Sequence, residues 1–99
     1  MASRKIQVEI SNEAKKSISD IAKYIEINGY PNTAENYAKE LLSFANTLSF
    51  FPLKYPICRK PSFAKRKFHC AVFEHYIFVY IILDDRIIIQ NVLHGRRIK

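Results

Sequence analysis

The chain has 99 residues and a formal net charge of +7, and 48% of its residues are hydrophobic, including seven Phe and six Tyr. This length is typical of a single domain, and this apolar content can form a core without help from a metal or a disulfide. The two Gly and four Pro are too few for a disordered tail, a long linker or a glycine loop that binds nucleotide phosphates. We therefore predict one domain, residues 1–99.

The positive charge lies entirely in the second half of the chain. Residues 1–50 hold six Lys or Arg and six Asp or Glu, whereas residues 51–99 hold ten and three. Such asymmetry in a small domain indicates a surface that meets polyanions, either nucleic acid or an acidic protein. We expect the first half to be scaffold and the second half to carry the activity.

Targeting and cofactor signals are weak. The N-terminal segment is charged rather than apolar, and the longest apolar run, residues 76–83, is much shorter than the 20 or so residues that span a bilayer. Cys58 and Cys70 are too few for a disulfide scaffold or a zinc site; one loop-to-strand disulfide is the alternative to the reduced, partly buried thiols that we predict. We predict a cytoplasmic protein without a metal, a cofactor or a membrane partner.

The first 30 residues predict a strand followed by a helix. Apolar and polar side chains alternate over residues 5–10, as in a strand with one buried face. Ser11 or Asn12 can cap the helix that follows, and the apolar residues between 14 and 25 form one helical stripe. Gly29 is a natural helix end.

A second helix is expected from Asn32, whose side chain and that of Glu35 form a pattern like a capping box. Its apolar stripe covers residues 34–48, and Pro52 ends it. Because few residues separate the two helices, they are predicted to form an antiparallel hairpin.

The connection from residue 51 to residue 65 is predicted to lack regular structure, because Pro52, Pro56 and Pro61 interrupt it. No acidic residue occurs between positions 54 and 67. We interpret the cations here as an anion-binding patch, with a solvated face as the alternative; they are Lys54, Arg59, Lys60, Lys65 and Lys67. Phe63 is the aromatic residue that we would expect to stack on a base if it is exposed.

Three strands complete the chain, over residues 66–73, 76–83 and 86–93. Glu74-His75 and Asp84-Asp85 separate them as tight turns. The middle strand is apolar on both faces and is therefore predicted to be central. The expected fold is α+β in the order β-α-α-β-β-β, with a helical hairpin packed on a mostly antiparallel four-stranded sheet.

An ordered set of short motifs resembles the RelE/ParE superfamily of toxins from type II toxin–antitoxin modules, over nearly the whole chain. After the opening strand, the motifs are residues 20–25, Ala34, Tyr37, Leu48, Pro52, residues 55–59, 76–80, 84–85 and 92–97. The resemblance implies a growth inhibitor that a cognate antitoxin neutralises, in a possible toxin–antitoxin hetero-oligomer. Within the superfamily, RelE-like members cut mRNA on the ribosome without a metal, and ParE-like members inhibit DNA gyrase.

His94 is the first candidate for chemistry. A histidine with a pKa near 6.5 can act as acid or base in RNA cleavage, and arginines can stabilise the phosphorane charge. By resemblance to ribonuclease members, His94 and Arg97 are candidate catalytic residues, with Arg66 as a helper on the phosphate. The alternative is that His94 bonds to the backbone at a strand end, while Arg96 and Arg97 contact the antitoxin or solvent.

Two departures from the ribonuclease pattern favour a ParE-like toxin. Ribonuclease members tend to carry an essential arginine in the middle of the second strand, where this chain has residues 70–72, Cys-Ala-Val. The acid/base group that several members place after the last strand is also missing, since only Ile98 and Lys99 remain. We therefore predict a toxin with a target such as gyrase, in which Arg96 joins the anion-binding cations. The alternatives are a metal-independent, ribosome-dependent endoribonuclease and a non-toxic basic module that binds RNA or protein.

Overall fold

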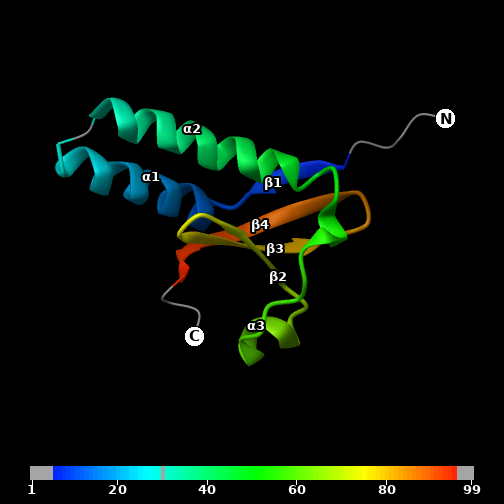
Figure 1. The fold of residues 1–99 in the computed structure, drawn as a ribbon. Coiled ribbons are helices and arrows are strands. Elements are labelled where there is room, and N and C mark those ends of the chain that lie inside the picture. Colours follow the sequence, from blue (N-terminus) through cyan, green and yellow to red (C-terminus); the bar gives the residue numbers. More distant parts are fainter. Residues whose placement is uncertain (1–5, 30, 96–99) are drawn as a thin grey trace.

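A computed structural model describes residues 6–29 and 31–95. In chain order the elements are β1 (Gln7–Ile10), α1 (Asn12–Ile27), α2 (Pro31–Thr47), the 3-10 turn η1 (Pro52–Lys54), α3 (Pro61–Lys65), β2 (His69–Phe73), β3 (Tyr76–Ile82) and β4 (Arg86–His94). The helices α1 and α2 form a hairpin along one face of the sheet, and α3 projects from the β2 side (Figure 1). The predicted α+β fold and its β-α-α-β-β-β order are confirmed.

The sheet has the strand order β1-β4-β3-β2. β1 runs parallel to β4, whereas β4, β3 and β2 are antiparallel to their neighbours. The strand predicted to be central, β3, does lie between two others. A register shift between Val79 and Tyr80 leaves Gln90 of β4 as the extra residue of a bulge.

Short-range signals set the ends of α1. Ser11 caps the helix by accepting a hydrogen bond from the Ala14 amide at 3.0 Å, and its hydroxyl donates to the Gln90 carbonyl at 2.7 Å. Gly29 follows the helix with φ of +91°, a conformation that suits glycine. Both ends agree with the prediction. The cap therefore also ties α1 to β4.

The predicted cap of the second helix is wrong. α2 begins at Pro31, so Asn32 lies within its first turn. Proline favours the first helical position because its fixed φ suits the helix and its missing N–H is not needed there. The helix ends at Thr47, and a turn separates it from Pro52.

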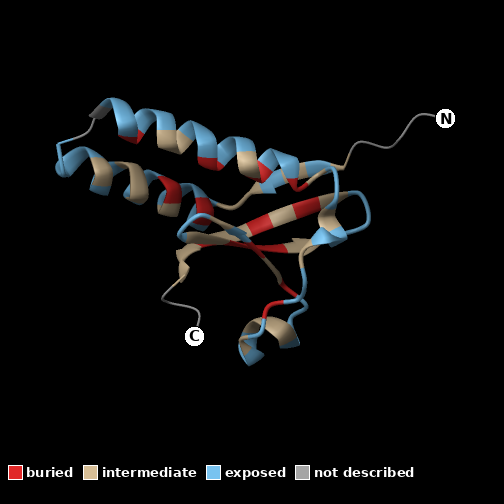
Figure 2. Cartoon of the chain, in the orientation of Figure 1, coloured by how far each residue is buried: buried red, intermediate tan, exposed pale blue. Residues whose placement is uncertain are grey.

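The main core lies between the helical hairpin and the sheet (Figure 2). Its fully or nearly fully buried members come from both helices, the turn after α2 and three strands: Ala14, Ile18, Leu41, Ala45, Leu48, Ala71, Phe78, Tyr80, Ile87, Ile89 and Val92. The Tyr80 hydroxyl donates to the Pro52 carbonyl at 2.6 Å, so this buried polar group is satisfied. Burial raises the pKa of Tyr80 to about 12.

The connection between α2 and the sheet is more ordered than predicted. Pro52 and Pro61 each begin a short helix, η1 and α3, instead of breaking one. The strand expected from residue 66 begins only at His69. Lys67 has φ of +61°, so the chain turns sharply there before it enters β2.

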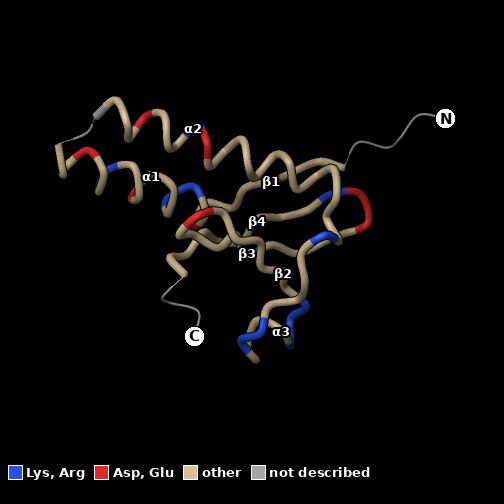
Figure 3. Tube along the Cα trace, viewed as in Figure 1, with Lys and Arg blue, Asp and Glu red and all other residues tan. Residues whose placement is uncertain are grey.

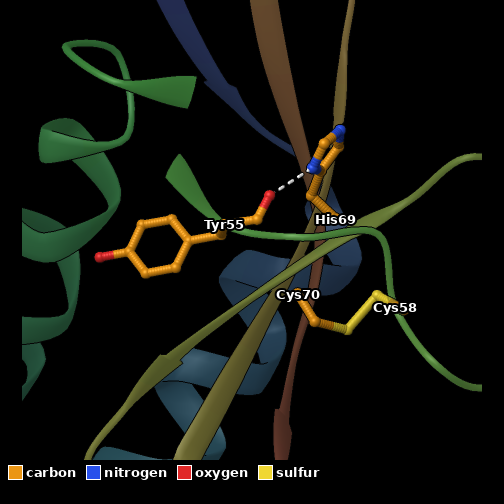
Figure 4. The surroundings of a disulfide bond; sticks show 4 residues. All are labelled: Tyr55, Cys58, His69 and Cys70. Carbon is orange, nitrogen blue, oxygen red and sulfur yellow. Dashed lines mark hydrogen bonds between the residues drawn. A yellow bond between two sulfur atoms is a disulfide. The ribbon is translucent and has the colours of Figure 1, made fainter. Parts of the chain in front are cut away.

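Cys58 and Cys70 form a disulfide, which corrects the predicted pair of reduced thiols (Figure 4). The reason is local backbone pairing. The Cys58 amide donates to the Phe68 carbonyl at 2.9 Å, and the Cys70 amide donates to the Pro56 carbonyl at 3.1 Å. This pairing lays the segment before α3 against the start of β2, and the two Cα atoms lie 5.0 Å apart.

Candidate functional site

His94 lies at the end of β4, opposite Tyr76 of β3. Its half-buried imidazole meets the Tyr76 ring edge-on at 5.5 Å between centroids and lies parallel to the His75 ring at 6.3 Å. The His75 carbonyl accepts a hydrogen bond from the Gly95 amide at 2.9 Å. The structure thus pairs His94 with a second histidine, His75, which the sequence places only in a tight turn between strands.

A pocket of about 630 Å³ opens beside His94, between α1 and β4. Its polar lining includes Asp20 and Asn91, and its aromatic lining comes from Tyr24 and Tyr76. Among the described residues, no Lys or Arg lines it. Burial, followed by the influence of Tyr24, raises the pKa of Tyr76. The described part of the lining therefore offers hydrogen-bonding groups and rings but no cation for a phosphate.

The predicted loop cations gather elsewhere. We define the α3 loop as residues 58–70, the segment that the disulfide closes. It contains α3, and Figure 3 shows Lys and Arg on and beside that helix. The cations of the loop are Arg59, Lys60, Lys65, Arg66 and Lys67.

Two aromatic contacts refine this picture. Lys60 Nζ lies 5.2 Å from the centroid of the Phe63 ring. That ring is partly buried and meets the Phe68 ring edge-on, with centroids 6.0 Å apart. Base stacking by Phe63 was expected only if its ring is exposed, and this condition is not met. Lys54 lies outside the loop, with its Nζ 5.5 Å from the centroid of the Tyr55 ring.

The structure does not bring Arg66 to His94. The strand register aligns His94 with Tyr76 and aligns His69 with Tyr80. The two rows are four residues apart along β3, about 13 Å at the usual rise per residue. Arg66 precedes β2 at the His69 end, on the α3 loop. Arg96 and Arg97 lie outside the described residues.

The contacts of His69 stabilise the fold and do not form part of a site. Its Nδ1 lies 2.7 Å from the Tyr55 carbonyl oxygen (Figure 4). Its ring stacks on that of Tyr80, with centroids 5.3 Å apart. These contacts tie the connection after η1 to the start of β2.

Within the described chain, no group of three or more His, Cys, Asp or Glu is placed to hold a metal ion. No helix of residues 6–29 and 31–95 is long and apolar enough to cross a membrane.

Comparisons with known proteins identify the family. A sequence search of curated proteins finds no match. A chain of the "Chromosomal ParDE TA system from P. aeruginosa" has a similar fold, with a TM-score of 0.78, 10% sequence identity, and coverage of 93% of this chain and 98% of that one. The family described as "ParE toxin of type II toxin-antitoxin system, parDE" matches residues 8–99. The chain therefore belongs to the ParE toxin family and is the toxin component of a type II toxin–antitoxin system.

Proposed function

We propose that this toxin inhibits growth by binding its target, DNA gyrase, and not by cutting RNA. One observation carries the proposal: within the described residues, the pocket beside His94 has no cation in its lining, and Arg66 lies at the other end of the sheet. Metal-free RNA cleavage needs an acid, a base and positive charge around one phosphate. Membership of the ParE family supports the same choice.

The toxin is neutralised by a cognate antitoxin in a hetero-oligomer. The structural neighbour, which is named as part of a ParDE system, supports this partner. We expect the antitoxin to present acidic residues to basic side chains of the toxin, since opposite charges favour association. Removing those acidic residues without any loss of affinity would contradict this part of the proposal.

A supercoiling assay with purified gyrase and purified toxin tests the target. We expect the toxin to inhibit supercoiling, and we expect mapped transcript ends from induced cells to show no cuts linked to codons. His94→Ala should keep the inhibition of gyrase, with His75→Ala as the matched control on the neighbouring ring. Codon-linked cuts that His94→Ala abolishes would overturn the proposal.

The ribonuclease alternative is favoured by one observation, the parallel pair of imidazoles. His75 and His94, 6.3 Å apart, could supply an acid and a base to the same substrate. In that case His75→Ala and His94→Ala would both abolish cleavage. The third alternative, a non-toxic basic module, predicts that induction of the protein leaves growth unchanged.

A further inference from the structure

We propose that the α3 loop binds the phosphate backbone of duplex DNA. The inference goes beyond gyrase inhibition, because it concerns the affinity of the toxin itself for DNA. Between the two bonded cysteines the loop carries five Lys or Arg and no Asp or Glu.

The charges of the loop are exposed and not neutralised. Arg59, Lys65, Arg66 and Lys67 are all exposed. Within residues 6–29 and 31–95, the ion pairs join Glu35 with Lys39 and Glu9 with Arg86, on other elements. The cations of the loop therefore have no carboxylate partner in the described chain, and they repel one another. A polyanion that binds here would relieve this repulsion and release its own counterions.

The loop is held in one shape. The disulfide and the backbone hydrogen bonds of Cys58 and Cys70 close its base. Phe68 is buried with Cys58 and Val79, and Phe63 packs against this small cluster. A braced loop holds its cations in place before binding, so less conformational entropy is lost when they meet phosphates.

The character of the surface favours phosphates over a protein partner. No large hydrophobic residue between positions 58 and 70 is exposed in the described chain, whereas protein interfaces are usually centred on apolar or aromatic anchors. The same lack favours a duplex over single strands, because proteins that bind single strands stack bases on exposed aromatic rings. Phosphate contacts need only positive charge and hydrogen-bond donors.

The backbone conformation of Lys67 is a second observation in favour of a binding role for the loop cations. Its φ of +61° is strained for a residue with a side chain, and glycine would adopt it without strain. The side chain is exposed, so packing does not explain why a lysine occupies this position. A charge that is needed for binding does explain it.

The test is a titration of a labelled 20-base-pair DNA duplex with the oxidised 99-residue toxin, followed by fluorescence anisotropy at several salt concentrations. Lys65→Ala with Arg66→Ala removes two charges from the loop. We expect this pair to weaken binding at least tenfold at low salt, and to reduce the magnitude of the slope of log affinity against log salt by about two. The matched control, Lys16→Ala with Lys23→Ala on the exposed face of α1, should change affinity less than threefold.

Three results would overturn the inference: no binding to the duplex, an equal loss in both pairs of variants, or tighter binding to a single strand or to duplex RNA. Circular dichroism of each variant checks that it is folded. Because the titration contains no gyrase, its outcome is separate from that of the supercoiling assay. A toxin that inhibits gyrase but does not bind DNA would overturn this inference alone.

Discussion

The region under the helical hairpin and the α3 loop are stabilised in different ways. The first buries eleven residues from two helices, the turn after α2 and three strands in one cluster. The second contributes Cys58 and Phe68 to a small buried cluster with Val79 of β3, and it is closed by a disulfide. Most residues of the loop are charged or exposed, so it cannot build a core of its own. A covalent bond and a few backbone hydrogen bonds replace the missing apolar contacts, and this leaves the surface of the loop free for positive charge.

The largest expected effect is in the main core. Phe78 is fully buried between the helices and the sheet, so Phe78→Ala should lower the free energy of unfolding by about 3–5 kcal/mol. Val72→Ala on β2, where the side chain is 60% exposed, is the control and should change it by less than about 0.5 kcal/mol. Denaturant unfolding measures both. Similar losses in the two variants would contradict the placement of the core.

Opening the disulfide is expected to have the next largest effect. Replacing both Cys58 and Cys70 with Ser should lower the free energy of unfolding by about 3 kcal/mol, because a loop of roughly 13 residues is no longer closed in the unfolded chain. Amide exchange should rise within the α3 loop while the amides of β3 and β4 stay protected. A dithiol reductant should have the same effect on the native protein and none on the double variant. Stability that does not change in either experiment would show that the bond does not brace the loop.

The buried hydroxyl of Tyr80 predicts a loss of stability at high pH. Its pKa is raised from 10 to about 12, so the folded state favours the neutral form. The contribution to stability is complete below pH 10 and is lost as the pH rises through 12. Burial also raises the pKa of Tyr37 and of Tyr76, which adds to the loss.

Tyr80→Phe tests this group directly. It removes the hydrogen bond to the Pro52 carbonyl and should lower the free energy of unfolding at pH 7 by about 1–2 kcal/mol. The variant should also lose less stability than the native protein between pH 10 and 12. Val72→Ala, at a site that is 60% exposed and has no titratable group, is the control and should leave the pH dependence unchanged. An identical alkaline transition in Tyr80→Phe would contradict the role of the buried hydroxyl.

The smallest expected effect is at Lys67, an exposed residue of the α3 loop with a left-handed backbone. Lys67→Gly relieves a left-handed backbone and should raise the free energy of unfolding by about 0.5–1 kcal/mol, since the greater freedom of the unfolded chain offsets part of the gain. It should also weaken DNA binding severalfold. Lys67→Ala keeps the strain and should weaken binding equally without the gain in stability. Unchanged binding in both variants would show that this charge has no role.

Local signals predicted much of the fold, and non-local pairing accounts for what they missed. The alternation in β1, the Ser11 cap and the end at Gly29 depend on neighbouring residues, so all three agree with the structure. The disulfide depends on a backbone pairing of Ile57 with His69 that no local pattern encodes. Pro61 was interpreted as a breaker, although at the first helical position it begins α3.

In the candidate site, too, local signals miss what depends on the pairing of distant segments. His94 lies at the end of the last strand, as its sequence position indicates. Its neighbour His75 is brought to it only by the pairing of β3 with β4, and Arg66 is separated from it by the direction of β2. The sequence therefore identified residue types suited to chemistry, but it did not determine which of them meet.

The parallel pairing of β1 with β4 determines how much of the chain must be synthesised before the toxin can fold. A nascent chain that has not yet been extended through β4 leaves its first strand without a neighbour, and its helices have no complete sheet to cover. Such long-range pairing forms late, because distant segments must first be brought together. The sheet that the helices cover is therefore complete only after β4 has been synthesised, so the toxin cannot reach its folded form earlier.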